Sequence, residues 1–145
     1  MTQSSPIQRA TVSYNPSTHF WSLIEDYSYV DKKRQVEIAV YKHSEYDLSS
    51  IPRFFWRVIA PFELSLEAPL IHDYLYVTNG GRRNDPKQKM RGDILSLQTG
   101  NKEQYTRKEA DLLFRTIMEQ AFVSPLNVDL AYSAVTVANL LNKWE

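Results

Sequence analysis

Three histidines are the residues of this chain best suited to acid–base chemistry, because histidine titrates near neutral pH. His19 precedes an expected strand and His43 ends another, so both are expected at the surface. His72 differs, because it lies directly before Asp73 in residues 68–77, the most apolar window of the chain. The sequence therefore places its first candidate site on an apolar helix that carries a His-Asp pair.

Asp111 is the candidate partner of His72, because it interrupts the apolar spacing of a second expected helix beside Leu112 and Leu113. If the two helices pack antiparallel, the carboxylate reaches the imidazole and forms the base-and-orienter pair of hydrolases. His72, Asp73 and Asp111 could instead supply ligands to a divalent metal ion. A third interpretation, favoured by these residues alone, is a structural bond between two helices.

Strands are expected before these helices, and one further helix after them. Residues 20–30 and 35–41 are rich in aromatic and β-branched residues and predict an antiparallel hairpin. Residues 54–59 predict one or two helical turns, and Pro69 suits the first turn of a helix over residues 68–77. Residues 128–144 predict a last amphipathic helix. The fold class predicted is α+β, with a small N-terminal antiparallel sheet packed on three or four helices.

The helix that carries Asp111 has the clearest start signal. Thr106 and Glu109 have the spacing of a capping box. Helical spacing then places a set of apolar residues on one face: Ala110, Leu113, Phe114, Ile117, Met118 and Ala121.

Two segments are expected to lack regular structure. Residues 1–17 are expected to form a loose N-terminal arm. Residues 78–105 contain every glycine of the chain and many basic residues, so they predict a long basic loop insertion. Its arginines Arg82 and Arg83, with Arg53 earlier in the chain and Arg107 just after the segment, are candidates for binding an anion.

Length and composition exclude several classes of protein. A chain of 145 residues predicts a single domain over residues 1–145. The absence of cysteine excludes disulfides, Cys-ligated zinc and thiol nucleophiles. A net charge of zero argues against general nucleic-acid binding. No apolar run has the length of a transmembrane segment, and residues 1–10 do not resemble a signal peptide, so a cytoplasmic protein is expected.

Three ordered motifs resemble the domain-of-unknown-function family 1353, whose members are small proteins of phages, prophages and bacteria. The motifs read DLSSIPRFFW (47–56), IHDYLY (71–76) and RKEADLLF (107–114). The resemblance runs from about Trp21 to the C-terminus, with Tyr46 in place of the usual Thr and Ser49 in place of the usual Ala. It implies that the family's polar positions form one site, made of His72, Asp73, Tyr76, Arg107 and Asp111.

The two helices are also similar to those of A2-type phospholipases. That likeness implies that His72 is the base, Asp73 a calcium ligand and Asp111 the group that orients the histidine. Phospholipases of this type have a glycine-rich calcium loop before the histidine, whereas no glycine precedes Gly80 here.

Three functions follow as alternatives. The sequence slightly favours a binding or structural module with a protein partner, such as a component of a phage-tail-like or contractile injection assembly, because no complete catalytic set can be assembled. The second is a metal-assisted hydrolase with His72, Asp73 and Asp111 at its centre, for which Arg53, Tyr76 and Arg107 are the candidate substrate-binding residues. The third is a regulatory protein that captures an anion or a nucleotide with its arginines.

Overall fold

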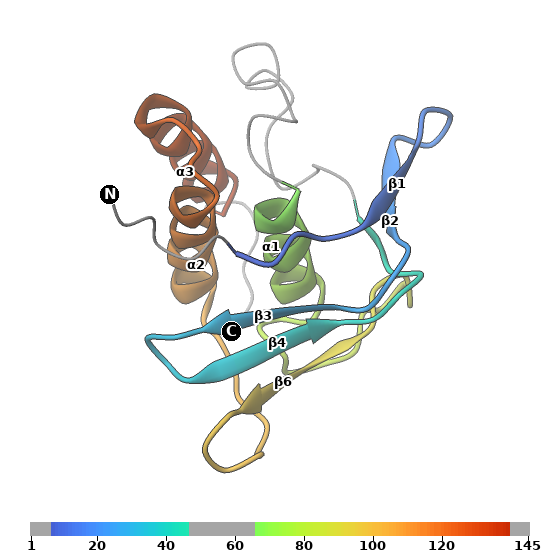
Figure 1. The fold of residues 1–145 in the computed structure, drawn as a ribbon, viewed down its shortest axis with the longest axis vertical. Coiled ribbons are helices and arrows are strands. Elements are labelled where there is room, and N and C mark those ends of the chain that lie inside the picture. The colour runs from blue at the N-terminus through green and yellow to red at the C-terminus, as the bar shows by residue number, and fades with distance from the viewer. Residues whose placement is uncertain (1–6, 47–65, 140–145) are drawn as a thin grey trace.

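The protein has an α+β fold, as predicted. The computed structural model describes residues 7–46 and 66–139 (Figure 1). Two three-stranded antiparallel sheets have the orders β1-β2-β5 and β3-β4-β6, and three helices accompany them. The elements are β1 (Val12–Asn15), β2 (Phe20–Leu23), β3 (Tyr27–Asp31), β4 (Val36–Val40), β5 (Glu45–Tyr46), α1 (Glu67–Val77), β6 (Gly92–Ser96), α2 (Arg107–Gln120) and α3 (Pro125–Asn139).

The strand expected over residues 20–30 is two strands that belong to different sheets. β2 pairs with β1 and β5, whereas β3 pairs with β4. Residues 20–22 are partly buried and Leu23 is buried, the next three residues are all exposed, and burial resumes at Tyr27. Three consecutive exposed residues cannot keep one face of a strand on the core, so this break separates the two sheets.

The predicted hairpin is confirmed as the pair β3–β4. Tyr29 lies opposite Ile38 in its register. Both strands bury alternate residues, with Val36, Ile38 and Val40 of β4 in the core. The turn between them contains Gln35 in the left-handed backbone region, with φ of 56°.

Two expectations about irregular segments were wrong. Residues 12–15 of the expected loose arm form β1, which pairs with β2 along Val12↔Leu23 to Asn15↔Phe20. Residues 92–96 of the expected loop insertion form β6, which completes the second sheet beside β4. Neither strand has a strong alternating pattern of its own, so pairing with a neighbouring strand decides its conformation.

The basic segment between α1 and β6 is held by a buried carboxylate. Asp85 accepts hydrogen bonds from the backbone amides of Lys87, Lys89 and Met90 at 3.0, 2.9 and 2.9 Å. The segment also pairs its backbone with the first sheet, where Glu45 N donates to Lys89 O at 2.9 Å. It is therefore an ordered connection, and its lysines and arginines stand on a fixed backbone.

The helices match their predicted positions closely. The capping box of α2 is present in full, with Thr106 and Glu109 each bonded to the other's backbone amide. α3 begins at Pro125, three residues before the expected start, and the expected end lies outside the described residues. The short helix expected over residues 54–59 also lies outside them.

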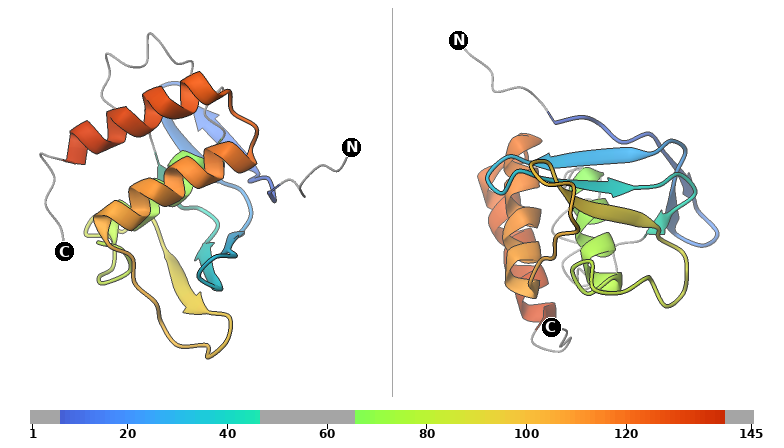
Figure 2. Two further views of the ribbon diagram at one scale, coloured as in Figure 1. Left: turned by 90° about the vertical axis from the view of Figure 1, so that its left-hand side faces the viewer. Right: turned by 90° about the horizontal axis from the view of Figure 1, so that it is seen from below.

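Helix α1 occupies the middle of the molecule. It has α2 on one side and the β1–β2 ribbon on the other (Figure 1), and α2 and α3 lie side by side beyond it (Figure 2). Every residue of α1 from Glu67 to Leu75 is buried. Whatever chemistry α1 carries is therefore enclosed by neighbouring elements and set by their contacts.

Candidate functional site

The contact between α1 and α2 positions the two candidate residues. The chain returns from α1 so that Tyr105 N donates to Gly80 O at 2.9 Å, just before α2 begins. The C-terminal end of α1 thus lies beside the N-terminal end of α2, and the helices run antiparallel. His72, two turns before Gly80, comes level with Asp111 in the second turn of α2.

The expected contact between His72 and Asp111 is present. His72 Nε2 lies 2.8 Å from Asp111 Oδ1, and the two side chains are 0% and 7% exposed. The hydroxyl of Tyr76 donates to the same oxygen at 2.9 Å. One carboxylate oxygen therefore receives two bonds from residues one helical turn apart on α1.

The contact with Asp111 sets the tautomer of His72 when the carboxylate is ionised. An ionised carboxylate only accepts hydrogen bonds, so a neutral His72 then donates from Nε2. The lone pair is then on Nδ1, which is the basic atom of the ring. The ring is held between Tyr76 and Phe114, with centroid distances of 4.3 and 4.9 Å.

Asp73 lies next to His72 in the chain but on a different side of α1. Burial, followed by the negative charges of Asp73 and Glu67, raises the pKa of Tyr46 in β5. Asp73 is thus close to β5, whereas His72 faces α2. The two residues are both buried and belong to different surroundings.

The metal-binding prediction for Asp73 receives no support from neighbouring ligands. Within residues 7–46 and 66–139, no group of three or more His, Asp or Glu side chains is arranged to hold a metal ion. A divalent ion usually needs more protein ligands than one carboxylate. The role of Asp73 as a metal ligand stays a prediction.

The candidate substrate-binding residues have separate positions. Arg107 is the first residue of α2, one turn before Asp111, and is partly buried. Tyr76 belongs to the His72–Asp111 contact. Arg53 lies outside the described residues.

The arginines of the expected anion site are bound to backbone carbonyls. Arg82 donates to Asn79 O and Tyr105 O, and Arg83 Nε donates to Val77 O at 3.2 Å. Their guanidinium groups therefore stabilise the C-terminal end of α1.

Glu67 is a buried charge that the sequence did not indicate. Glu67, at the start of α1, is fully buried and accepts bonds from Arg9 Nε at 3.2 Å and Ala10 N at 2.7 Å. This contact ties the N-terminal segment to α1. A glutamate at the start of a helix is so common that its position alone gave no signal.

No helix of the described residues has the length and apolar character needed to cross a membrane.

Comparisons with known proteins identify a family and no individual relative. Comparison with curated proteins and with solved structures finds no match. Residues 21–135 match the family described as "Protein of unknown function (DUF1353)", and this range contains all three motifs. Because the match spans most of the chain, the protein belongs to the DUF1353 family.

Proposed function

We propose that the protein is a hydrolase in which His72 takes a proton from water and Asp111 positions the histidine. The observation that carries this proposal is the oxygen Asp111 Oδ1, which receives both His72 Nε2 and Tyr76 Oη. A histidine fixed in this way has one defined tautomer and one defined ring orientation, as a general base requires.

The proposed step uses the tautomer that donates from Nε2. Nδ1 of His72 takes the proton of the attacking water, whose oxygen bonds to the carbon or phosphorus of the substrate, and the imidazolium still donates from Nε2 to Asp111. The ester bond then breaks, and Nδ1 returns the proton to the leaving alcohol. The carboxylate stabilises this cation because the pair is shielded from solvent. Tyr76 then acts as a positioning residue, since its hydroxyl is directed at Asp111.

The substrate class proposed is an ester, a phosphoester or a bond of the cell envelope. Arg107 lies one turn from Asp111 and is the described residue best placed to meet a substrate that carries negative charge. A metal ion bound at Asp73 would polarise the substrate, as the likeness to A2-type phospholipases implies. None of the steps given for His72 depends on that ion.

A substitution that separates the base from the hydrogen bond tests the proposal. His72→Gln retains an amide donor close to the position of Nε2 but has no basic atom. We expect hydrolysis of p-nitrophenyl esters, bis(p-nitrophenyl) phosphate or phospholipid vesicles by the wild type, and a loss of about 100-fold or more in the folded His72→Gln protein. His19→Asn is the control, because His19 is exposed and Asn tolerates its φ of 62°.

Absence of wild-type hydrolysis in every assay, or full activity of His72→Gln, would contradict the proposal. Each assay is run with EDTA, calcium or zinc. If Asp73 binds a metal, calcium or zinc raises the melting temperature of the wild type but not of Asp73→Asn. Asp129→Asn, at an exposed position on α3, should keep the wild-type response.

A second candidate function is favoured by the enclosure of His72. Its side chain is 0% exposed and is packed between two aromatic rings, as in a structural contact between helices. In this alternative the protein is a binding or structural module of a phage-tail-like or contractile injection assembly. A stable protein partner that is retained by His72→Gln and is insensitive to chelators would support it.

Capture of an anion or a nucleotide is the third prediction. The bonds of Arg82 and Arg83 to backbone carbonyls do not favour it. Nucleotide binding that weakens with rising ionic strength would support it.

A further inference from the structure

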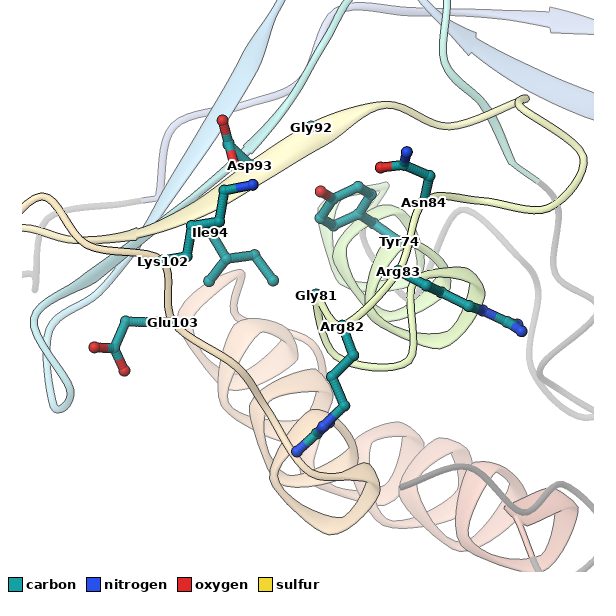
Figure 3. A pocket seen from close by; sticks show the side chains of 10 residues that line it. All are labelled: Tyr74, Gly81, Arg82, Arg83, Asn84, Gly92, Asp93, Ile94, Lys102 and Glu103. Carbon is teal, nitrogen blue, oxygen red and sulfur yellow. The ribbon is translucent and has the colours of Figure 1, made fainter.

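A polar cavity lies on the side of α1 that faces away from His72. Tyr74 follows His72 by two residues, which places the two side chains about 200° apart around the helix. Tyr74 lines a pocket of about 260 Å³, here called the β6 pocket. One wall is the turn of residues 81–84 after α1, and the other is formed by residues 92–94 and 102–103 (Figure 3).

The hydroxyl of Tyr74 is the unusual group of this pocket. The residue is only 4% exposed, yet its hydroxyl makes no hydrogen bond to any part of the chain that the structure describes. Figure 3 shows the phenol directed into the pocket, toward the β6 wall. The hydroxyl oxygen is not one of the buried polar atoms that lack a partner among the described residues, so it is open to the pocket and available to a molecule there.

A glycine gives this phenol its place. A Cβ atom at Gly92 would lie 2.0 Å from Ala39 O and 2.9 Å from Tyr74 Cζ. The backbone of β6 thus passes directly over the phenol ring. Any side chain at this position would push the ring away from the pocket or break the pairing with β4.

The charges around the pocket nearly cancel. Arg83 donates to Val77 O at the end of α1, whereas Arg82 donates to Asn79 O just after α1 and to Tyr105 O just before α2. The carboxylate of Glu103, which lines the cavity, lies 3.7 Å from Arg34. The lining therefore holds three basic and two acidic residues, and each guanidinium keeps its charge while it donates to a carbonyl. With both signs of charge present, phosphate is the comparison that tests whether the excess basic residue decides what binds.

The lining offers donors and acceptors together. The Lys102 ammonium donates, the Asp93 carboxylate accepts, and the Asn84 amide does both. Burial and the charge of Asp93 raise the pKa of Tyr74, so that its hydroxyl stays neutral and can also donate and accept. Alcohol groups match such a lining, because each hydroxyl gives one hydrogen bond and receives others.

We propose that the β6 pocket binds a small neutral ligand rich in hydroxyl groups, of the size of one sugar ring. The cavity is smaller than the ~300–1,000 Å³ of sites for drug-sized molecules, which limits the ligand to about one ring. The site is separate from His72 and Asp111. This inference therefore does not depend on the proposed hydrolase activity.

Titration of the full chain with single sugars tests the inference. The probes are D-glucose, D-galactose and N-acetyl-D-glucosamine, with inorganic phosphate as the anionic comparison. Binding is measured by calorimetry and by saturation-transfer NMR. We expect at least one sugar to bind, and phosphate to bind more weakly.

Variants connect the binding to the pocket. Tyr74→Phe should lower the sugar affinity about ten-fold while leaving the melting temperature unchanged, because the lost hydroxyl has no partner in the described chain. Asn84→Ala should lower the affinity as well. Tyr132→Phe removes a hydroxyl on α3, outside the pocket, and should bind like the wild type.

Three results would overturn the inference. They are the absence of binding by every sugar tested, tighter binding of phosphate than of sugar, and equal sugar affinity of Tyr74→Phe and wild type. Because Tyr74→Phe keeps the phenyl ring that packs under Gly92, a change in binding cannot be ascribed to loss of the fold when its melting temperature is unchanged.

Discussion

The two sides of α1 differ in whether their polar side chains have hydrogen-bond partners within the protein. On the side of α2, His72 and Tyr76 direct a ring nitrogen and a hydroxyl at one oxygen of Asp111, at 2.8 and 2.9 Å. On the side of β6, the hydroxyl of Tyr74 is directed into a pocket and forms no hydrogen bond with the described residues. The polar atoms of His72 and Tyr76 are thus bonded within the protein, whereas the hydroxyl of Tyr74 on the same helix is not.

This difference separates stability from binding. Polar atoms that are bonded to each other in the interior contribute to the folded state, and removing one leaves its partners unpaired. A hydroxyl that opens into a cavity forms no hydrogen bond within the protein, so a ligand can use it without loss of a bond that stabilises the fold. Substitutions on the two sides of α1 should therefore differ in what they change.

The largest expected effect is a loss of stability at alkaline pH, where the buried tyrosines on both sides of α1 ionise. Burial is the main cause that raises the pKa of Tyr29 to about 12, and it also raises the pKa of four others: Tyr27, Tyr46, Tyr74 and Tyr105. Below about pH 10 these groups are protonated in both states, and their contribution to stability is fully present. Above it the unfolded chain releases its protons first, so the free energy of unfolding falls by about 1.4 kcal/mol per pH unit for each group.

The protein should consequently unfold in one step between about pH 10 and the pKa of about 12 of Tyr29. Tyrosinate absorbance and far-ultraviolet circular dichroism, followed in one alkaline titration, should change together. Gradual ionisation of these tyrosines in a protein that keeps its native dichroism would show that they are not buried as described.

The next largest effect is expected at Asp111. Asp111→Ala removes the acceptor of two buried donors and should lower the free energy of unfolding by about 2–4 kcal/mol. Glu119→Ala on the same helix removes an exposed partner of Arg115 and should change it by less than ~0.5 kcal/mol. Urea unfolding of both variants makes the measurement, and equal midpoints would mean that the Asp111 contact does not stabilise the protein.

Local patterns in the sequence predicted the side of α1 that faces α2. The capping box at Thr106 and Glu109 gives the start of α2, and the apolar spacing gives its buried face. Together with the apolar window around His72, these signals were enough to predict the contact with Asp111. Each depends on residues within one or two helical turns of each other.

The β6 side could not be predicted in the same way. β6 becomes a strand because β4 offers it a partner, and the pocket forms because Gly92 lets β6 approach the phenol of Tyr74. Both depend on residues that are far apart in the sequence. In the sequence, Tyr74 looks like an ordinary core residue of an apolar helix. Only the structure shows that its hydroxyl has no hydrogen-bond partner in the described chain.

The smallest expected effect is a difference in stability between two variants, Tyr46→Phe and Tyr74→Phe, each of which removes one hydroxyl close to α1. Tyr46 donates to Leu66 O at 3.0 Å, so Tyr46→Phe leaves a buried carbonyl without this donor and should lower the free energy of unfolding by about 1 kcal/mol. Tyr74→Phe should change it by less than ~0.5 kcal/mol, because no hydrogen bond within the described residues is lost. The two proteins are compared by urea unfolding in the absence of sugars. If Tyr74→Phe is destabilised as much as Tyr46→Phe, the hydroxyl of Tyr74 has a structural partner, and the contrast between the two sides of α1 does not hold.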